Sequence, residues 1–168
     1  AISYTKGQAY ALRALAHFDL LRMYGQHFIT GQGGGGSLGV PYVKTYKNPD
    51  NLTPARDTVG SNVGDITADI TTAISMMSAS LDSSAAYMTV AGAYAIGARA
   101  LLYAGSVNSS LYATAGTMAK WVIDNSGKTP VSAAGFNASY STDYASTQFL
   151  SFLSQVQIIE ELMELLIS

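Results

Sequence analysis

The chain has 168 residues, only 12% of them charged, and a formal net charge of −2. This length suits one domain with a sizeable core. The absence of a basic excess argues against nucleic acid as a partner. Because there is no cysteine, disulfides, thiolate metal sites and a cysteine nucleophile are excluded. No apolar run reaches the ~18 residues that a membrane span requires.

The first predicted element is a helix over residues 4–24, ended by Gly25. Its large apolar residues recur at helical spacing on more than one face, with alanines between them, so we expect neighbouring helices on two sides. We expect the core to contain Leu12, Leu15, Phe18 and Leu21, and Met23 belongs to the same apolar pattern.

Residues 26–51 are predicted to be irregular. Four consecutive glycines, residues 33–36, and the prolines Pro41 and Pro49 disfavour regular structure. We expect a mobile loop at the glycines. Residues 40–43 are expected to be extended, because the residue before a proline avoids the helical region.

A second helix is predicted over residues 59–79. One apolar stripe runs along it at three- and four-residue spacing, which indicates a helix with one buried side. The stripe consists of Val59, Val63, Ile66, Ile70, Ala73 and Met77. Gly60 and Gly64 are unfavourable inside a helix, so its first turns are expected to be frayed or closely packed. Residues 81–88 read as a serine-rich turn.

Two further helices are predicted over residues 89–104 and 111–125. Together they form a helical hairpin in which Tyr94, Ala98, Leu101 and Gly105 occupy the large, small, large and turn positions of a tetratricopeptide repeat. Such hairpins bury their apolar faces by stacking. Beyond them we expect a loop over residues 129–146 and a last, amphipathic helix within residues 148–167, whose position relative to the others is left open.

Four segments, in order, carry a resemblance to a known family. The run G-Q-A-x-x-L-R-A-x-x-x-F-D-L-x-R-x-Y-G at residues 7–25 is followed by G-V-P at residues 39–41, and residues 56–73, 89–105 and 112–127 continue the match. This order resembles the SusD/RagB family of outer-membrane nutrient-binding lipoproteins. The expected fold is therefore all-α, with tetratricopeptide-like stacked helical hairpins and long irregular loops. Residues 1–127 resemble the family, and residues 128–168 remain unassigned.

The resemblance implies a function and a location. It implies a surface-exposed protein of the outer membrane that captures glycans or other nutrients and delivers them to a SusC-like TonB-dependent transporter. It also implies a lipid anchor outside this segment, no enzymatic activity and no cofactor. Family members are several times longer, so we expect residues 1–168 to form a single helical domain within a longer chain.

A different class of function is a tetratricopeptide-type scaffold that binds peptides in a helical groove. The expected concave faces are mostly alanine and lack the asparagine and lysine handles of such grooves, which argues against it. A lipoprotein signal upstream would support the first reading, and additional 34-residue repeats would support the second.

The polar residues of the first helix are expected to be structural. Asp19 and Arg22 are three residues apart and Arg13 and His17 four apart, so each pair can meet on the helix surface. We expect these side chains to pair or to bind backbone carbonyls of adjacent helices. His17 and Asp19 point to different sides, which gives a catalytic His/Asp pair no local support.

Other candidate sites are weaker. Asp65 and Asp69 lie one helical turn apart and could share a metal ion or a proton, but a solvated helix face is the favoured interpretation. His27 is isolated and is interpreted as a loop residue. Gly31 and the glycines at 33–36 lack the G-K-[ST] of a phosphate loop. We therefore assign no catalytic residue and no metal site.

Aromatic residues in the predicted loops are the remaining candidates for a ligand face. They are Tyr42, Tyr46, Phe136, Tyr140 and Tyr144. Exposed rings can stack on sugars. The favoured alternative is that they cap the ends of the helical hairpins. No family motif present here is a ligand motif, so the ligand-binding residues remain unknown.

Overall fold

The computed structural model describes residues 1–26, 33–46, 49, 52–83 and 87–127. In these ranges the chain is helical, with α1 (Ile2–Tyr24), α2 (Val59–Met76), a short 3₁₀ turn η1 (Ala79–Leu81), α3 (Val90–Ala104) and α4 (Ser110–Asn125). No strand occurs within them, and one isolated antiparallel bridge joins Leu38 and Thr58. The predicted all-α fold is confirmed.

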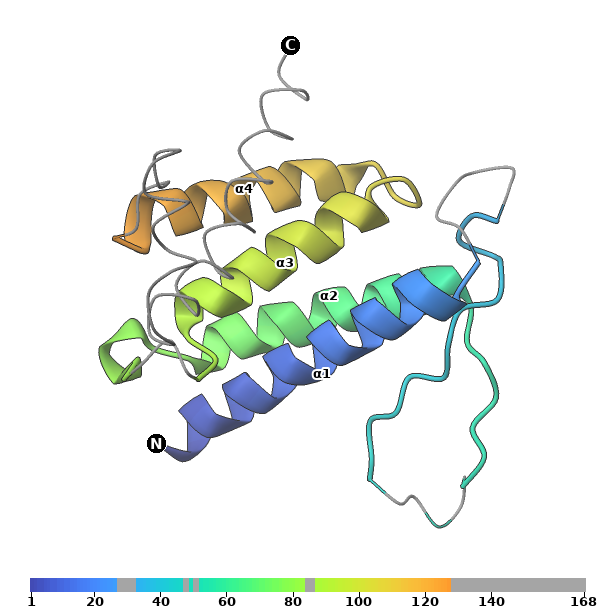
Figure 1. Cartoon of the computed structure of the whole chain (residues 1–168), viewed down its shortest axis with the longest axis horizontal. Helices are drawn as coiled ribbons and strands as arrows, with labels where there is room; N and C mark the ends of the chain where they lie inside the picture. Colours follow the sequence, from blue (N-terminus) through green and yellow to red (C-terminus); the bar gives the residue numbers. More distant parts are fainter. Residues whose placement is uncertain (27–32, 47–48, 50–51, 84–86, 128–168) are drawn as a thin grey trace, which may run out of the picture.

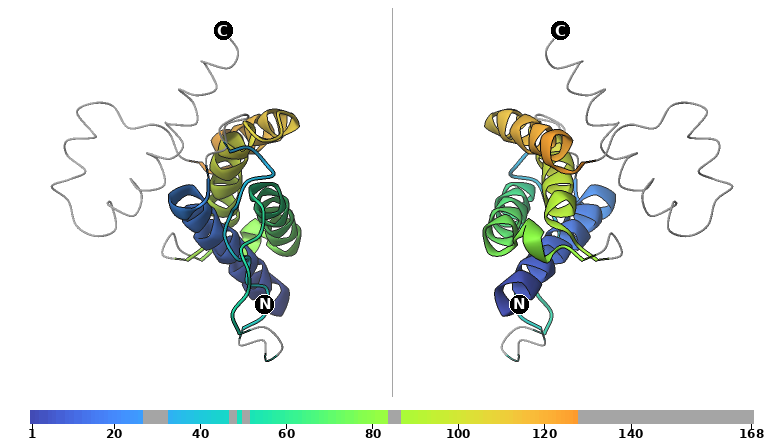
Figure 2. Two further views of the ribbon diagram at one scale, coloured as in Figure 1. Left: turned by 90° about the vertical axis from the view of Figure 1, so that its right-hand side faces the viewer. Right: turned by 90° about the vertical axis from the view of Figure 1, so that its left-hand side faces the viewer.

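The helices are stacked in pairs (Figure 1). α1 packs along α2, α2 contacts α3, and α3 packs along α4, whereas α1 and α3 touch only lightly. Seen nearly end-on, α3 lies over the α1–α2 pair and α4 lies on the far side of α3 (Figure 2). α1 and α4 are thus the outer members of the stack.

α2 forms as predicted, with one buried side. All six residues of its apolar stripe are buried, and the Thr58 hydroxyl caps the helix by accepting a hydrogen bond from the Ser61 amide at 3.1 Å. The helix ends three residues earlier than expected. Met77, the C-cap residue, is the last buried residue of the stripe, and the chain then continues into the serine-rich segment.

The α3–α4 hairpin follows the predicted pattern. Ala98 and Leu101 are buried, and the Tyr94 ring stacks on Trp121 of α4 with 4.0 Å between ring centroids. α3 begins after Thr89, whose hydroxyl accepts from the Gly92 amide. Gly105 follows its last turn in a helical conformation, and the Tyr112 ring occupies the space that a side chain there would need.

The prediction for α1 is correct at its end, begins two residues late, and is only partly correct in its core. Phe18 and Leu21 are buried, and Leu15 packs against the main core from a partly buried position. Leu12 and Met23, in contrast, are 52% and 60% exposed. The expectation that Leu12 belongs to the core is wrong, because α2 and α3 cover only one side of α1. The predicted loop and last helix in residues 128–168 lie outside the described residues.

Candidate functional site

The densest polar cluster lies between α1, α2 and the segment at residues 40–44. The Arg13 guanidinium binds both carboxylate oxygens of Asp69, at 2.6 Å from Nε and 2.7 Å from Nη2. The Tyr42 hydroxyl donates to the same carboxylate at 2.7 Å. Asp69 is 6% exposed, so the interpretation of a solvated face is wrong for this residue. A buried carboxylate is tolerated here because three donors satisfy it.

These contacts set the protonation states of the cluster. Burial by itself would raise the pKa of Asp69, but the hydrogen bonds from Arg13 and Tyr42 outweigh it and hold that pKa below its usual value. Burial, followed by the hydrogen bond to Asp69, raises the pKa of the Tyr42 hydroxyl well above its usual value. At neutral pH the cluster therefore contains a carboxylate, a guanidinium and a neutral phenol.

His17 fixes the backbone of the same segment. Its ring stacks on Tyr42 with 4.0 Å between centroids, and the Val43 amide lies 3.1 Å from Nε2. Since an amide can only donate, Nε2 accepts, and Nδ1 carries the proton toward the Arg13 carbonyl at 2.9 Å. Arg13 and His17 thus meet, as their spacing predicted, but the carbonyl that His17 binds belongs to its own helix and not to an adjacent one.

Asn62 of α2 binds the start of the segment at residues 40–44. Its side chain is fully buried and exchanges two hydrogen bonds with the backbone of Val40, at 2.8 and 2.9 Å. Arg56 adds a hydrogen bond from Nε to the Gly39 carbonyl at 2.7 Å and one from Nη2 to the Tyr24 carbonyl at 3.0 Å. The G-V-P segment is therefore anchored to α2 by Asn62 and to the end of α1 by Arg56 of the connection.

The two aspartates of α2 have separate partners. Asp65 pairs with Lys44 at 2.7 Å, whereas Asp69 pairs with Arg13. Within the described ranges, no three histidine or acidic residues come together in a way that could hold a metal ion. The contacts assign both aspartates to ion pairs that fasten residues 40–44 and α1 to α2.

The glycine-rich segment is anchored, where the sequence predicted a mobile loop. The Gly60 amide donates to the Gly35 carbonyl at 2.7 Å, and the Val59 amide donates to the Ser37 carbonyl at 2.8 Å. Gly35 and Gly60 are in close contact, which accounts for a glycine in the first turn of α2. Because these amides already have acceptors, the helix start offers no phosphate cradle. Gly31 lies outside the described residues.

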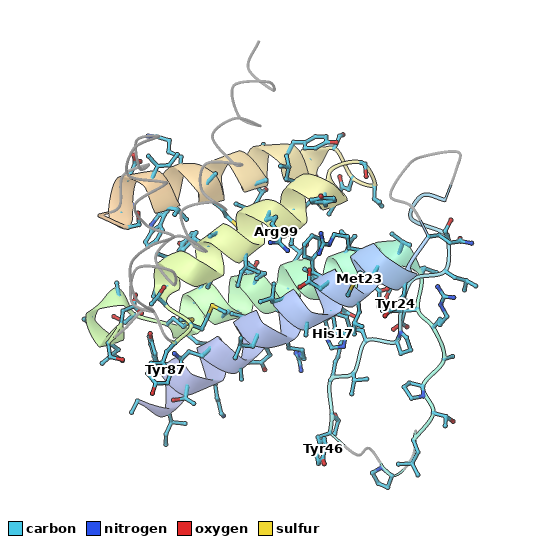
Figure 3. The ribbon with its side chains drawn as sticks, in the orientation of Figure 1. His17, Met23, Tyr24, Tyr46, Tyr87 and Arg99 are labelled. Atoms are coloured by element: carbon cyan, nitrogen blue, oxygen red, sulfur yellow. The ribbon has the colours of Figure 1, made fainter. Side chains whose placement is uncertain are left out.

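A second polar cluster joins α1 to α3. Asp19 accepts from Arg22 at 3.1 Å, as predicted from their spacing, and also from Arg99 of α3 at 3.2 Å. The Arg99 guanidinium lies 5.5 Å from the centre of the Phe18 ring, on the side of α1 that faces α3 (Figure 3). Arg99 was not predicted, because nothing in the sequence relates positions 80 residues apart.

The loop tyrosines have opposite environments. Tyr42 is 8% exposed and packs against the sides of α1 and α2, at His17 and Asp69, and not against their ends as the favoured alternative predicted. Tyr46 is 84% exposed and lies away from the helices on the segment that follows (Figure 3). Tyr24 and Tyr87 are also exposed, near opposite ends of α1. His27, Phe136, Tyr140 and Tyr144 lie outside the described residues.

The structure defines a scaffold of helical hairpins whose buried polar groups are engaged with one another. None of the described helices is long and apolar enough to cross a bilayer. The family model described as SusD-like, starch-binding associating with outer membrane, matches residues 2–102. The chain therefore belongs to the SusD-like family, as the resemblance of its motifs indicated.

Two solved structures from Bacteroides vulgatus are similar to this chain. One, described as a candidate sugar-binding protein, is 33% identical with a TM-score of 0.60, over 73% of this chain and 26% of that protein. The other, a SusD superfamily protein, is 29% identical with a TM-score of 0.60, over 77% and 28% respectively. A search of curated proteins finds no match. The chain thus spans about a quarter of the length of these two structures.

Proposed function

We propose that these helices are the scaffold of a longer, surface-exposed glycan-binding protein of the outer membrane, which passes its ligand to a SusC-like TonB-dependent transporter. The observation that carries this proposal is the family match over residues 2–102, whose description names starch binding and association with the outer membrane. A lipid anchor outside this segment would hold the protein at the membrane. The proposal includes no chemical step and no cofactor.

The geometry of the polar clusters supports the scaffold role of these helices. Arg13, Asp69 and Tyr42 saturate one another, and His17 has both ring nitrogens engaged with backbone atoms. A catalytic group needs an open coordination or hydrogen-bonding position toward a substrate. These side chains instead hold the segment at residues 40–44 in place, which is a structural task.

Among the described residues, Tyr46 is the loop aromatic best placed to meet a sugar. Its ring projects from an anchored segment and is largely exposed. Stacking on an aromatic ring contributes about 0.5–1.5 kcal/mol, or about two- to tenfold in affinity. Most of the ligand site would lie outside the described residues, since the longer relatives contain about three times as much additional chain.

Calorimetric titration with starch oligosaccharides tests the proposal. The full-length protein and residues 1–168 are titrated side by side, each with a Tyr46→Ala variant and with Tyr87→Ala as the matched exposed control. We expect the full-length protein to bind, Tyr46→Ala to weaken binding two- to tenfold, and Tyr87→Ala to leave it unchanged. Failure of the full-length protein to bind any oligosaccharide would overturn the glycan assignment.

A further inference from the structure

The outer side of α1 carries a continuous apolar face. Every third or fourth residue from the N-terminal end of the helix to its last turn is exposed and uncharged, and apart from Thr5 all are apolar. The residues are Ile2, Thr5, Ala9, Leu12, Ala16, Leu20 and Met23. At 100° per residue these positions fall within about 80° of one another, so they form one straight stripe. We call it the outer stripe.

The outer stripe lies opposite the buried face of α1. The buried face, which includes Ala11, Ala14, Phe18 and Leu21, packs on α2 and α3. Leu12, Leu20 and Met23 of the outer stripe are 52%, 40% and 60% exposed. Scattered exposed leucines are ordinary on a protein surface, but a contiguous apolar stripe along six turns of a helix marks a surface made to be covered.

The chemistry of the stripe indicates what covers it. Small residues lie between large ones along it, and three- and four-residue spacing is the pattern that receives the ridges of another helix. Its lack of charges differs from transient protein interfaces, which are about as polar as the remaining surface, and resembles a domain core. The occupant is therefore a helix that remains in place.

The length of the solved relatives indicates where such a helix would come from. This chain covers only 26% and 28% of their length, so about three quarters of each lies outside the matched region. We propose that the outer stripe of α1 is an internal interface, covered by a helix of the same full-length protein. This inference rests on the proposed function only in requiring that these residues belong to a longer protein.

Cysteine reactivity tests this directly, because the chain contains no cysteine of its own. Leu12→Cys and Leu20→Cys report on the outer stripe, Tyr46→Cys is the exposed control, and Ala14→Cys is the buried control. Each variant is made in the full-length protein and in residues 1–168, and the rate of reaction with a small maleimide is measured under native conditions.

We expect the stripe cysteines to react at least 100-fold more slowly than Tyr46→Cys in the full-length protein. In residues 1–168 they should react within about tenfold of that control. Stripe cysteines that react as fast as Tyr46→Cys in the full-length protein would overturn the inference, and so would a native protein no longer than this chain. Oligosaccharide binding, measured on the same samples, reports separately on the proposed function.

Discussion

The two helical pairs are held together in different ways. Between α3 and α4 the helices approach on small residues, with Ala95 and Ala98 of α3 facing Val122 and Ala119 of α4. Between α1 and α2 a buried polar cluster, Arg13–Asp69 with Tyr42, accompanies the apolar contacts. The α3–α4 pair is held by close packing alone, whereas the α1–α2 pair also fixes the position of a long connection.

This difference separates the parts of the molecule by role. A short turn joins the two helices of the α3–α4 hairpin, and the hairpin stacks on α2 through α3. The α1–α2 pair is joined by residues 25–58 and also holds residues 40–43 of that connection, through His17 of α1 and Asn62 of α2, while Arg56 of the connection binds Gly39. The polar contacts are therefore concentrated between α1 and α2, where they hold the long connection in place.

The largest expected effect is in the apolar part of the α1–α2 pair. Phe18 is 1% exposed and contacts α3 through Tyr103. Phe18→Ala should lower the free energy of unfolding by about 3–5 kcal/mol, because it leaves a cavity in the main core. Leu12→Ala is the matched control on the same helix and should change it by less than about 1 kcal/mol in residues 1–168. Urea denaturation followed by circular dichroism measures both.

The polar cluster offers the next largest effect. Asp69→Asn removes the charge that compensates Arg13 and should cost about 2–3 kcal/mol, less than for a fully buried pair because Arg13 is partly exposed. Asp65→Asn is the control on the same helix. It breaks only the more exposed pair with Lys44 and should cost less than about 1 kcal/mol. Equal losses in the two variants would contradict a special role for the cluster.

Asp69 also gives the cluster a pH dependence. Its pKa is lower in the folded state than in the unfolded chain, so the stabilisation is present above about pH 4 and is lost as the pH falls through the folded-state value. The difference in stability between the parent chain and Asp69→Asn should therefore shrink on acidification. A difference that is constant from pH 7 to pH 3 would show that the carboxylate charge is not the cause.

The helices could be predicted from the sequence, and the cluster could not. The α2 stripe and the Tyr94, Ala98 and Leu101 positions of α3 follow from local periodicity; the stripe, Ala98 and Leu101 are buried, and Tyr94 is partly buried against Trp121. The Arg13–Asp69 pair joins residues 56 positions apart, and Tyr42 and Tyr46 have the same local signal with opposite exposure. Long-range pairing depends on how the helices stack, which periodicity does not determine.

The close packing of α3 predicts a contrast between two glycines. A methyl group at Gly97 would lie 2.7 Å from both the Ile70 Cγ2 and the Met118 Sδ atoms, whereas one at Gly64 would meet nothing within 4 Å. Gly97→Ala should destabilise by about 1 kcal/mol, because overpacking outweighs the gain in helix propensity. Gly64→Ala should stabilise by about 0.5–1 kcal/mol. Thermal denaturation should show opposite shifts in Tm.

The smallest expected effect occurs at alkaline pH. It concerns the contact between α1 and the start of α3. The Tyr4 hydroxyl donates to Asp82, and the Asp82 carboxylate also accepts from the Val90 amide at 3.2 Å. Burial and the bond to Asp82 raise the pKa of Tyr4 to about 12. Since its folded-state pKa is higher than in the unfolded chain, the contribution is complete below about pH 10 and is lost between about pH 10 and 12.

Tyr4→Phe separates this titration from those of the other tyrosines. The variant lacks the hydroxyl, so the difference between its alkaline titration at 295 nm and that of the parent chain isolates Tyr4, and we expect a midpoint near pH 12. The variant should also lose the extra fall in stability above about pH 10. A difference titration centred near pH 10 would mean that the Tyr4 hydroxyl is not held by Asp82.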